Sequence, residues 1–205
     1  MNAKKIPDII IGRLPVYLRA LQHMADLGLK TTSSQELGER VGISAAQIRK
    51  DISQFGEFGK QGTGYSIEYL IDKLREILKV NQIWDVVVVG AGDVGHALVN
   101  YQGFSDRGFQ VVAIFDKDKS KVGGEIGRFK VEDTDDMAGR IRELGVKIAM
   151  VTVPAPAAQA VADQLIQAGV KAILNYAPIS LNVPNHVKVQ YIDPSTHLQR
   201  MTYYL

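Results

Sequence analysis

The 205-residue chain contains no cysteine, which excludes disulfides, thiolate metal sites and thiol-based redox switching. Any response of this protein to redox state must therefore come from a bound cofactor. No apolar run approaches the roughly 18 residues of a membrane-spanning helix. The first seven residues carry two lysines but no apolar stretch long enough for a signal peptide. We therefore expect a cytoplasmic protein that does not enter a membrane.

Neither sign of charge dominates, because 24 Lys and Arg face 22 Asp and Glu, for a net charge of +2. The excess lies in the first part of the chain. Residues 1–82 hold 12 basic and 9 acidic side chains, whereas residues 83–205 hold 12 and 13. So small a basic excess usually marks a solvated surface, and it indicates nucleic-acid binding only if it falls on one recognition surface.

The most specific motif follows the apolar run 86–89, where Gly90, Gly92 and Gly95 have the spacing of a dinucleotide fingerprint. The first glycine permits a tight turn, the second lets backbone N–H groups approach a pyrophosphate, and the third lets a helix pack closely on the strand. We predict a phosphate loop formed by Gly90, Ala91, Gly92, Asp93, Val94 and Gly95. The negative charge of Asp93 suits this loop only if its side chain points outward, toward the positive helix N-terminus.

A second apolar strand, 111–115, ends at Asp116, 21 residues after Gly95. A carboxylate at this place accepts hydrogen bonds from the adenosine ribose hydroxyls and repels a 2′-phosphate. The pattern therefore predicts NADH and NAD⁺ as cofactors, with Asp116 and Lys117 at the adenosine end. Lys117 and Lys119 would soften the repulsion, so NADP stays an alternative.

Three further apolar segments, 148–153, 172–175 and 187–192, complete the pattern of an α/β, doubly wound Rossmann domain. Ligands bind such sheets beyond the carboxyl ends of the strands. We expect the nicotinamide side to comprise Val153, Pro154, Asn175, Tyr176, Ala177 and Pro178. The prolines have an alternative role as strand terminators.

The first 80 residues have helical periodicity and must form something separate from the Rossmann domain. Ser33 to Glu36 and Ser44 to Gln47 are both typical of capping boxes, and the helices they start are joined by Gly42 and Ile43. Two short helices in this arrangement predict a helix-turn-helix. The glycine-rich segment 56–65 then predicts the wing of a winged helix.

The second of these helices would present basic and amide side chains to DNA. Arg49 and Lys50 suit guanine edges or phosphates, and Gln47 or Gln54 suit adenine. The expected DNA-binding residues are Ser44, Gln47, Arg49, Lys50, Gln54, Lys60, Gly62 and Tyr65. A plain interaction or oligomerisation domain is the alternative.

These patterns divide the chain into three parts. Residues 1–80 form a winged-helix DNA-binding domain that ends in a linking helix, 67–80. Residues 81–193 form the Rossmann domain, and residues 194–205 form a helix whose apolar side chains have no place in a finished sheet. A partner subunit would cover them.

Several motifs in order resemble those of the Rex family of bacterial redox-sensing transcriptional repressors. They cover essentially the whole chain: residues 49–59, the turn 62–65, the fingerprint, 115–118 with 121–123, 153–154 and 175–178. The resemblance implies a non-enzymatic homodimer without metal, in which the terminal helix, 194–205, is exchanged between protomers. It also implies that the dimer binds palindromic operators, represses fermentation and anaerobic-respiration genes, and leaves the DNA when NADH binds. It places Arg49 and Lys50 on the operator and Lys60 in the wing.

The resemblance also assigns Arg19, Tyr101 and Asp193 to a switch in which the aspartate of one subunit changes partners in the other. Without it, Tyr101 would be interpreted as a core aromatic on the helix after the fingerprint. The chain departs from some relatives at Gln61, in place of a basic wing residue, and at Pro194, in place of an aromatic. These departures concern phosphate contact and the nicotinamide pocket.

Two other functions fit parts of the sequence. Tyr69 and Lys73 have the YxxxK spacing of a short-chain dehydrogenase, but they precede the fingerprint instead of following it. A scaffold that needs NAD only to fold is the third possibility, and it predicts no affinity for DNA.

Overall fold

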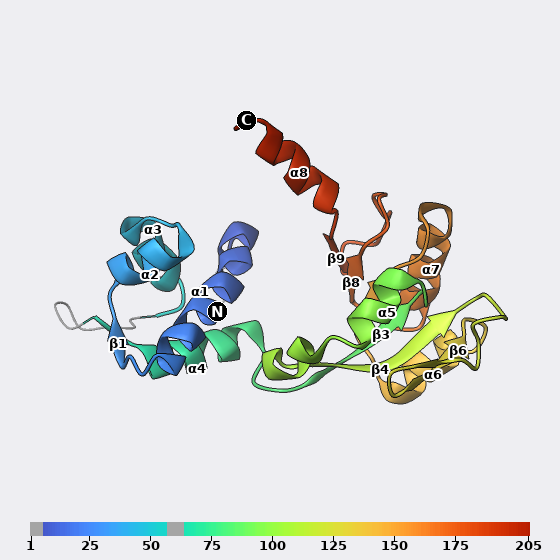
Figure 1. Cartoon of the computed structure of the whole chain (residues 1–205). Helices are drawn as coiled ribbons and strands as arrows, with labels where there is room; N and C mark the ends of the chain where they lie inside the picture. Colours follow the sequence, from blue (N-terminus) through green and yellow to red (C-terminus); the bar gives the residue numbers. More distant parts are fainter. Residues whose placement is uncertain (1–5, 57–63) are drawn as a thin grey trace. The chain divides into compact units, whose positions relative to one another are not determined.

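The computed structural model describes residues 6–56 and 64–205, so the predictions for Lys60, Gln61 and Gly62 lie outside the described residues. The chain divides into two compact units, Met1–Gln82 and Ile83–Leu205 (Figure 1). Each unit has a hydrophobic core of its own.

The described part of the first unit consists of helices and a small antiparallel ladder. Its described elements are α1 (Asp8–Asp26), β1 (Thr31–Thr32), α2 (Ser34–Val41), α3 (Ala45–Ile52), β2 (Tyr65–Ser66) and α4 (Ile67–Leu78). β1 pairs with β2, which joins the segment before α2 to the segment after the glycine-rich stretch. Short helices with a two-stranded ladder fit the predicted winged helix, whose predicted wing, 56–65, lies mostly outside the described residues.

Local sequence signals define the ends of these helices. The Ser33 hydroxyl accepts from the backbone N–H of Glu36, whose carboxylate accepts from the N–H of Ser33, so the first capping box is confirmed. Gly42, with φ of 71°, ends α2 in the left-handed conformation. The second box is only half formed. Ser44 accepts from the N–H of Gln47, but the Gln47 side chain turns to Asp51.

The core of the first unit lies between α1, α2, α3 and α4. Leu14, Leu21, Ile48 and Leu70 are almost completely buried there. α4 packs along α1 and ends at Leu78, two residues before the predicted end, with Lys79 in a left-handed conformation. The predicted linking helix is thus part of the first unit's core.

The second unit is a seven-stranded sheet with helices on both faces. Its described strands are β3 (Trp84–Val89), β4 (Phe109–Asp116), β5 (Glu125–Ile126), β6 (Phe129–Asp133), β7 (Ile148–Val151), β8 (Ala172–Asn175) and β9 (Lys188–Tyr191). Its described helices are α5 (Asp93–Val99), η1 (Gln102–Arg107), α6 (Met137–Leu144), α7 (Ala155–Gln167) and α8 (Pro194–Thr202).

The strand order is β5-β6-β4-β3-β7-β8-β9, and every pair is parallel except β5 with β6. β3, the first strand of the unit, lies in the middle, and the chain winds outward from it in both directions. This is the doubly wound Rossmann topology, so the predicted fold class is confirmed.

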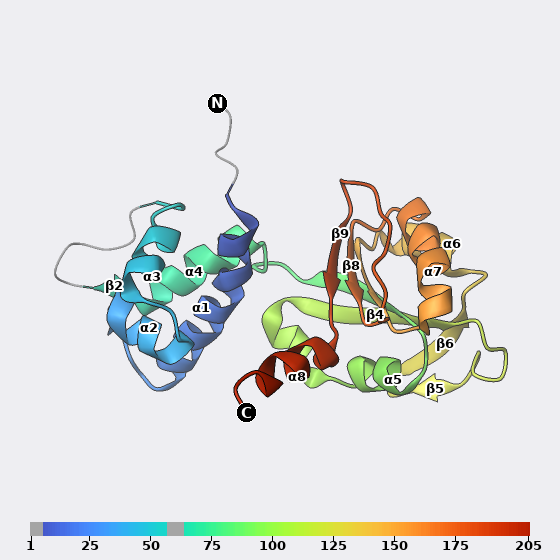
Figure 2. The ribbon, with the colours of Figure 1, turned by 90° about the horizontal axis from the view of Figure 1, so that it is seen from above.

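Alternate residues of the central strands pack on opposite faces of this sheet. Val87 and Val89 belong to the core under α6 and α7, whereas Val86 and Val88 belong to the core that Leu98 of α5 contacts. Figure 2 shows α6 and α7 on one side of the sheet and α5 on the other. A strand buried on both faces has to be apolar throughout, which explains the run of four valines.

α8 differs from the other described α-helices, because none of its residues is buried. Leu198, Met201, Tyr203 and Tyr204 are each more than 60% exposed. Among the described residues, no helix has both the length and the apolar character needed to cross a membrane.

Candidate functional site

A cavity of about 820 Å³ opens at the carboxyl ends of β3, β4, β7 and β8. This is where the strand order reverses, the position at which doubly wound sheets bind their ligands. The lining combines the phosphate loop, the end of β4, the start of α7 and the turn after β8. It includes Gly90, Gly92, Val94, Asp116, Lys117, Lys121, Thr152, Val153, Pro154, Tyr176, Ala177 and Pro178.

Two of the three fingerprint glycines, Gly90 and Gly95, are required by close backbone approaches. Gly90 has φ of 109°, which side chains rarely adopt, and a Cβ there would lie 2.8 Å from Thr152 atoms. A Cβ on Gly95 would lie 1.9 Å from the carbonyl oxygen of Gly90. A Cβ on Gly92 would meet nothing within 4 Å, and Gly92 lines the cavity. The loop is therefore shaped so that backbone faces the cavity at Gly92.

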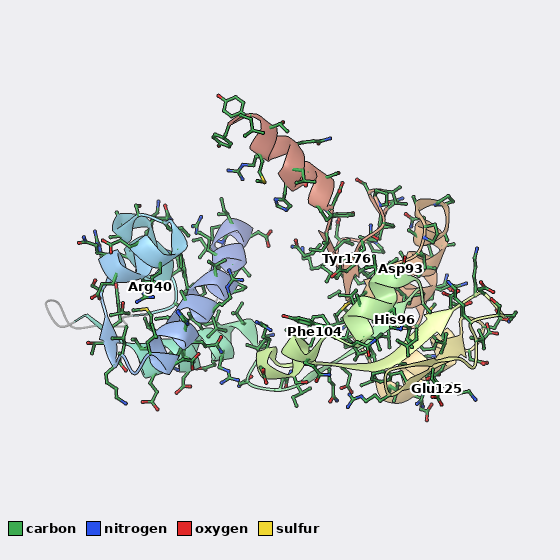
Figure 3. All side chains as sticks on the ribbon, in the orientation of Figure 1. Arg40, Asp93, His96, Phe104, Glu125 and Tyr176 are labelled. Atoms are coloured by element: carbon green, nitrogen blue, oxygen red, sulfur yellow. The ribbon has the colours of Figure 1, made fainter. Side chains whose placement is uncertain are left out.

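Thr152 is a residue that the sequence reasoning missed. Its Oγ1 lies 2.8 Å from the Gly90 carbonyl oxygen and 3.0 Å from that of Val89, so its hydroxyl donates to the start of the loop. The only sequence signal was its place just after an apolar strand. Asp93, at the start of α5, is exposed and does not line the cavity, as its predicted outward orientation requires (Figure 3).

Asp116 is 9% exposed and lies in the cavity wall. Its Oδ2 accepts from the N–H of Ala91 at 2.7 Å, and its Oδ1 accepts from the N–H of Asp118 at 2.9 Å. The same carboxylate thus fastens the phosphate loop to the end of β4. Each carboxylate oxygen keeps a further lone pair with which to accept from a ribose hydroxyl.

The cations near Asp116 are arranged differently from the prediction. The Lys119 ammonium pairs with Asp133 and Asp135, which raise the pKa of Lys119, so it faces β6. Lys121 lies nearest to Asp116 instead, with Nζ 3.6 Å from Oδ2. Lys117 lines the cavity as predicted.

Most of the predicted nicotinamide residues line the cavity, but Asn175 does not. Asn175 is fully buried. Its Oδ1 accepts from the N–H of Ala177, and its Nδ2 donates to the carbonyls of Ala177 and Ile179, each at 3.0 Å. The side chain therefore builds the turn that presents Tyr176, Ala177 and Pro178. Burial raises the pKa of Tyr176, consistent with a poorly hydrated end of the cavity.

In the first unit, the predicted reading helix is α3. Arg49 and Lys50 are exposed on it, and the Gln54 amide donates at 3.4 Å to the carbonyl oxygen of Lys50. The Tyr65 hydroxyl lies 3.3 Å from the Ser34 hydroxyl, which ties β2 to α2. Arg49 and Lys50 thus remain available for a ligand on the surface of α3.

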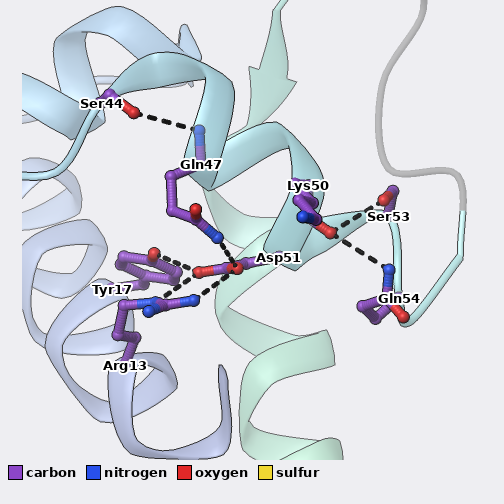
Figure 4. Close-up of polar contacts among 8 residues, drawn as sticks. All are labelled: Arg13, Tyr17, Ser44, Gln47, Lys50, Asp51, Ser53 and Gln54. Carbon is purple, nitrogen blue, oxygen red and sulfur yellow. Dashed lines mark hydrogen bonds and ion pairs between the residues drawn. The ribbon is translucent and has the colours of Figure 1, made fainter. Parts of the chain in front are cut away.

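Gln47 is placed differently from the expected adenine reader. Its Nε2 donates to Asp51 Oδ1 at 2.6 Å, and the residue is half-buried (Figure 4). Asp51 also accepts from the Arg13 guanidinium at 2.6 and 2.7 Å and from the Tyr17 hydroxyl at 2.7 Å. The sequence reasoning assigned Asp51 no role, although it shares a helix face with Ile48 and Ile52.

Asp51 is completely buried, which by itself pushes its pKa upward. Hydrogen bonds from Arg13, Tyr17 and Gln47 more than offset that burial, so the pKa of Asp51 lies below its ordinary value. Burial and the bond to Asp51 raise the pKa of Tyr17. Asp51 is therefore a charged carboxylate that accepts hydrogen bonds from Arg13, Tyr17 and Gln47.

The three expected switch residues lie on three different elements. Arg19 is exposed on α1. Tyr101 precedes η1, is 51% exposed and accepts at 3.2 Å from Arg107, so its interpretation as a core aromatic is wrong. Asp193 caps α8, accepting from the N–H and hydroxyl of Ser195, which lowers the pKa of Asp193.

The residues that suggested a dehydrogenase lie elsewhere. Tyr69 and Lys73 are on α4 in the first unit, and Lys73 pairs with Glu76 at 2.6 Å. None of the residues that line the described cavity is a histidine, and no metal-binding cluster of His, Asp or Glu occurs among residues 6–56 and 64–205.

Two protein-family models match the chain. One, described as "CoA binding domain", matches residues 81–179, and the other, described as "Putative DNA-binding protein N-terminus", matches residues 5–53. The first covers most of the Rossmann fold, and the second covers α1, α2 and α3.

Relatives and solved structures match over nearly the full length. The chain is 51% identical to the redox-sensing transcriptional repressor Rex of Chloroflexus aggregans, over 97% of this chain and 94% of the relative. It is 45% identical to Rex of Pelotomaculum thermopropionicum, over 100% and 96%.

Among solved structures, RSP in complex with β-NAD⁺ and operator DNA matches with a TM-score of 0.93 and 36% identity, covering 98% of this chain and 93% of that one. RSP in complex with β-NADH matches with a TM-score of 0.89 and 34% identity, covering 97% and 93%. With both units matched in one relative at this identity, the chain belongs to the Rex family of redox-sensing transcriptional repressors.

Proposed function

We propose that this protein is a transcriptional repressor that binds palindromic operator DNA and is released by NADH. The observation that carries the proposal is the pairing of two sites in one chain. One is a dinucleotide cavity with Asp116 in its wall, and the other is a helix that presents Arg49 and Lys50. The names of the full-length relatives support it, as do the RSP complexes with both cofactor forms and with operator DNA.

For the DNA, we assign base and phosphate contacts to Arg49, Lys50 and Gln54 on α3, with Ser44 at its N-terminus and Tyr65 near the wing. Guanidinium and ammonium groups suit guanine edges and phosphates, and an amide suits adenine. Lys60 and Gly62 complete the proposed wing. Gln47 takes part only if it leaves Asp51.

For the cofactor, we assign the pyrophosphate to the loop 90–95, the adenosine ribose to Asp116 and the nicotinamide to the residues after β7 and β8. NAD⁺ carries a positive nicotinamide ring and NADH a neutral one. The apolar lining at Val153, Pro154, Ala177 and Pro178 favours the neutral ring, because burying an unpaired charge is costly. This difference supplies the redox signal without catalysis.

We further propose a homodimer in the cytoplasm, with residues 1–80 as the DNA-binding domain, 81–193 as the cofactor domain and 194–205 as an exchanged helix. The exposed apolar side chains of α8 support a partner subunit. Arg19, Tyr101 and Asp193 are its proposed switch. NADH would draw the cofactor domains together and change the spacing of the two reading helices.

The test is fluorescence anisotropy of a labelled palindromic promoter fragment at fixed salt, titrated with the protein and then with NADH, NAD⁺ or coenzyme A. We expect sequence-dependent binding that NADH releases and that NAD⁺ and coenzyme A do not. Absence of specific binding across promoters, under every cofactor condition, would contradict the proposal and favour an enzyme or a scaffold.

Asp116→Ala sharpens this test. It removes the proposed ribose acceptor and the hydrogen bond from the Ala91 N–H. The response to NADH should therefore weaken while DNA binding is kept. Glu143→Ala, which changes the same charge on an exposed site of α6, is the matched control. Equal loss of both activities in Asp116→Ala would count against the assignment.

A further inference from the structure

The carboxylate of Asp51 joins the reading helix to α1 through directional bonds. Arg13 Nη2 and Gln47 Nε2 donate to Oδ1 at 2.7 and 2.6 Å, and Arg13 Nε and the Tyr17 hydroxyl donate to Oδ2 at 2.6 and 2.7 Å (Figure 4). Asp51 is completely buried, whereas the side chain of Arg13 remains 22% exposed. The network therefore ties α3 to a helix more than 30 residues away in sequence.

Apolar packing alone would constrain the rotation of α3 about its axis less tightly. Ile48 and Ile52 bury their side chains beside Asp51, but hydrophobic contacts have no preferred direction and permit small rotations of a helix about its axis. The paired guanidinium and carboxylate have a fixed planar geometry. The direction in which Asp51 points thus sets the directions of Arg49 and Lys50, which come two residues and one residue before it.

The network also fixes which side chains reach the surface. Gln47 is drawn toward the interior by its bond to Asp51, while Arg49 and Lys50 stay exposed. A change in Asp51 would release an amide one turn away from it on the same face of the helix. The set of groups offered to a base pair would then change.

Resting on the proposed function, we propose that Asp51 is a positioning residue for operator recognition, which fixes the rotation of α3 and holds Gln47 away from the DNA. It does not contact DNA itself. Phosphate contacts tolerate a small misalignment, whereas hydrogen bonds to base edges do not. Loss of the network should therefore reduce specific binding much more than non-specific binding.

The experiment compares Asp51→Asn and Arg13→Lys with the wild-type full-length chain. Asp51→Asn nearly keeps the side-chain volume but removes the charge. Arg13→Lys keeps the charge but removes the planar fork. Anisotropy at one salt concentration measures the affinity of each protein for the operator and for a scrambled duplex of equal length.

In both variants we expect operator affinity to fall about 10-fold or more, and affinity for the scrambled duplex to change less than about twofold, because only base readout needs the alignment. Asp72→Asn, an exposed aspartate on α4, makes the same charge change and should leave both affinities unaltered. Circular dichroism checks the helices of every variant.

An unchanged ratio of operator to scrambled affinity in Asp51→Asn and Arg13→Lys would overturn the proposal. A parallel loss of both affinities with the helices intact would also overturn it, since the network would then support every contact with DNA and not the alignment of base readout in particular. If Asp51→Asn unfolds the first unit, Arg13→Lys decides. Failure of the wild-type chain to recognise any operator is a separate outcome, which contradicts the proposed function.

Discussion

The two units fix their functional groups by different means. In the first unit, side chains do this work: Asp51, with four hydrogen bonds from Arg13, Tyr17 and Gln47, holds the reading helix. In the second unit, close backbone approaches at Gly90 and Gly95 give the phosphate loop its shape, and side chains such as Asp116 and Thr152 then bond to that backbone. A unit held by side chains responds to changes of charge, whereas a unit shaped by glycine responds to added volume.

Added volume at Gly95 should have the largest effect. In Gly95→Val, Cβ would lie 1.9 Å from the Gly90 carbonyl oxygen, which cannot move without distorting the phosphate loop. We expect NADH affinity, measured by cofactor fluorescence, to fall by about 100-fold or more, or roughly 2.7 kcal/mol. Operator binding should remain but no longer respond to NADH.

Gly139→Ala is the matched control for that experiment. It adds a Cβ to the same unit on α6, where nothing lies within 4 Å. NADH affinity should be unchanged. If Gly95→Val binds NADH normally, the close approach at the fingerprint is not what shapes the site.

Removing the cationic side chains of α3 should weaken operator binding and leave NADH binding unchanged. Arg49→Ala and Lys50→Ala are each expected to weaken operator binding by about 1–3 kcal/mol if the side chain contacts a base. If the side chain contacts a phosphate, the slope of log affinity against log salt concentration should instead decrease in magnitude by about one. Measuring operator affinity over a range of salt concentrations separates the two.

Lys171→Ala, an exposed lysine of the second unit, is the control for these variants. NADH affinity should stay at the wild-type value in all three proteins. If both α3 variants keep the operator affinity and the salt dependence of the wild type, then neither Arg49 nor Lys50 contacts the DNA.

Lowering the pH should affect the stability of the two units differently, because their carboxylates differ in burial. Because the pKa of Asp51 is lowered in the folded state, its contribution to stability is present above its ordinary value of about 3.9 and is lost as pH falls below it, through the folded pKa. The lowered pKa values of Asp118 and Asp133 in the second unit arise from exposed bonds and pairs, which stabilise little.

The measurement uses two probes during one acid titration. Trp84 is the single tryptophan and lies on β3, so its fluorescence follows the second unit, while circular dichroism follows the helices of both. We expect part of the helical signal to be lost at higher pH than the fluorescence change. Coincident transitions would argue against independent acid responses.

The smallest effect is expected at Lys121. Its pair with Asp116 is long, at 3.6 Å, and its side chain is 43% exposed, so Lys121→Ala should change NADH affinity by less than about fivefold. The same change should reduce NADPH binding more, because Lys121 is the cation nearest the ribose acceptor. Competition of NADPH against NADH measures the difference, and equal effects on both would remove Lys121 from the recognition of a 2′-phosphate.

The sequence by itself determined the features that depend on neighbouring residues. Ser33 and Glu36 form a cap because they are three residues apart, and Gly42 ends α2 because it adopts a left-handed conformation. The valines of β3, the glycine spacing and the apolar strand before Asp116 gave the doubly wound fold and the end of the sheet that holds the cavity.

Only the tertiary structure decided the partners of the polar side chains whose bonds depend on residues remote in sequence. Gln47 turns to Asp51 because Arg13 and Tyr17 of a distant helix have fixed that carboxylate in the core. Thr152 meets Gly90 across 62 residues, and Lys119 meets Asp133 on a neighbouring strand while Lys121 takes the place beside Asp116. Spacing along the chain fixes backbone conformation, but a hydrogen bond between remote residues depends on where folding brings their atoms.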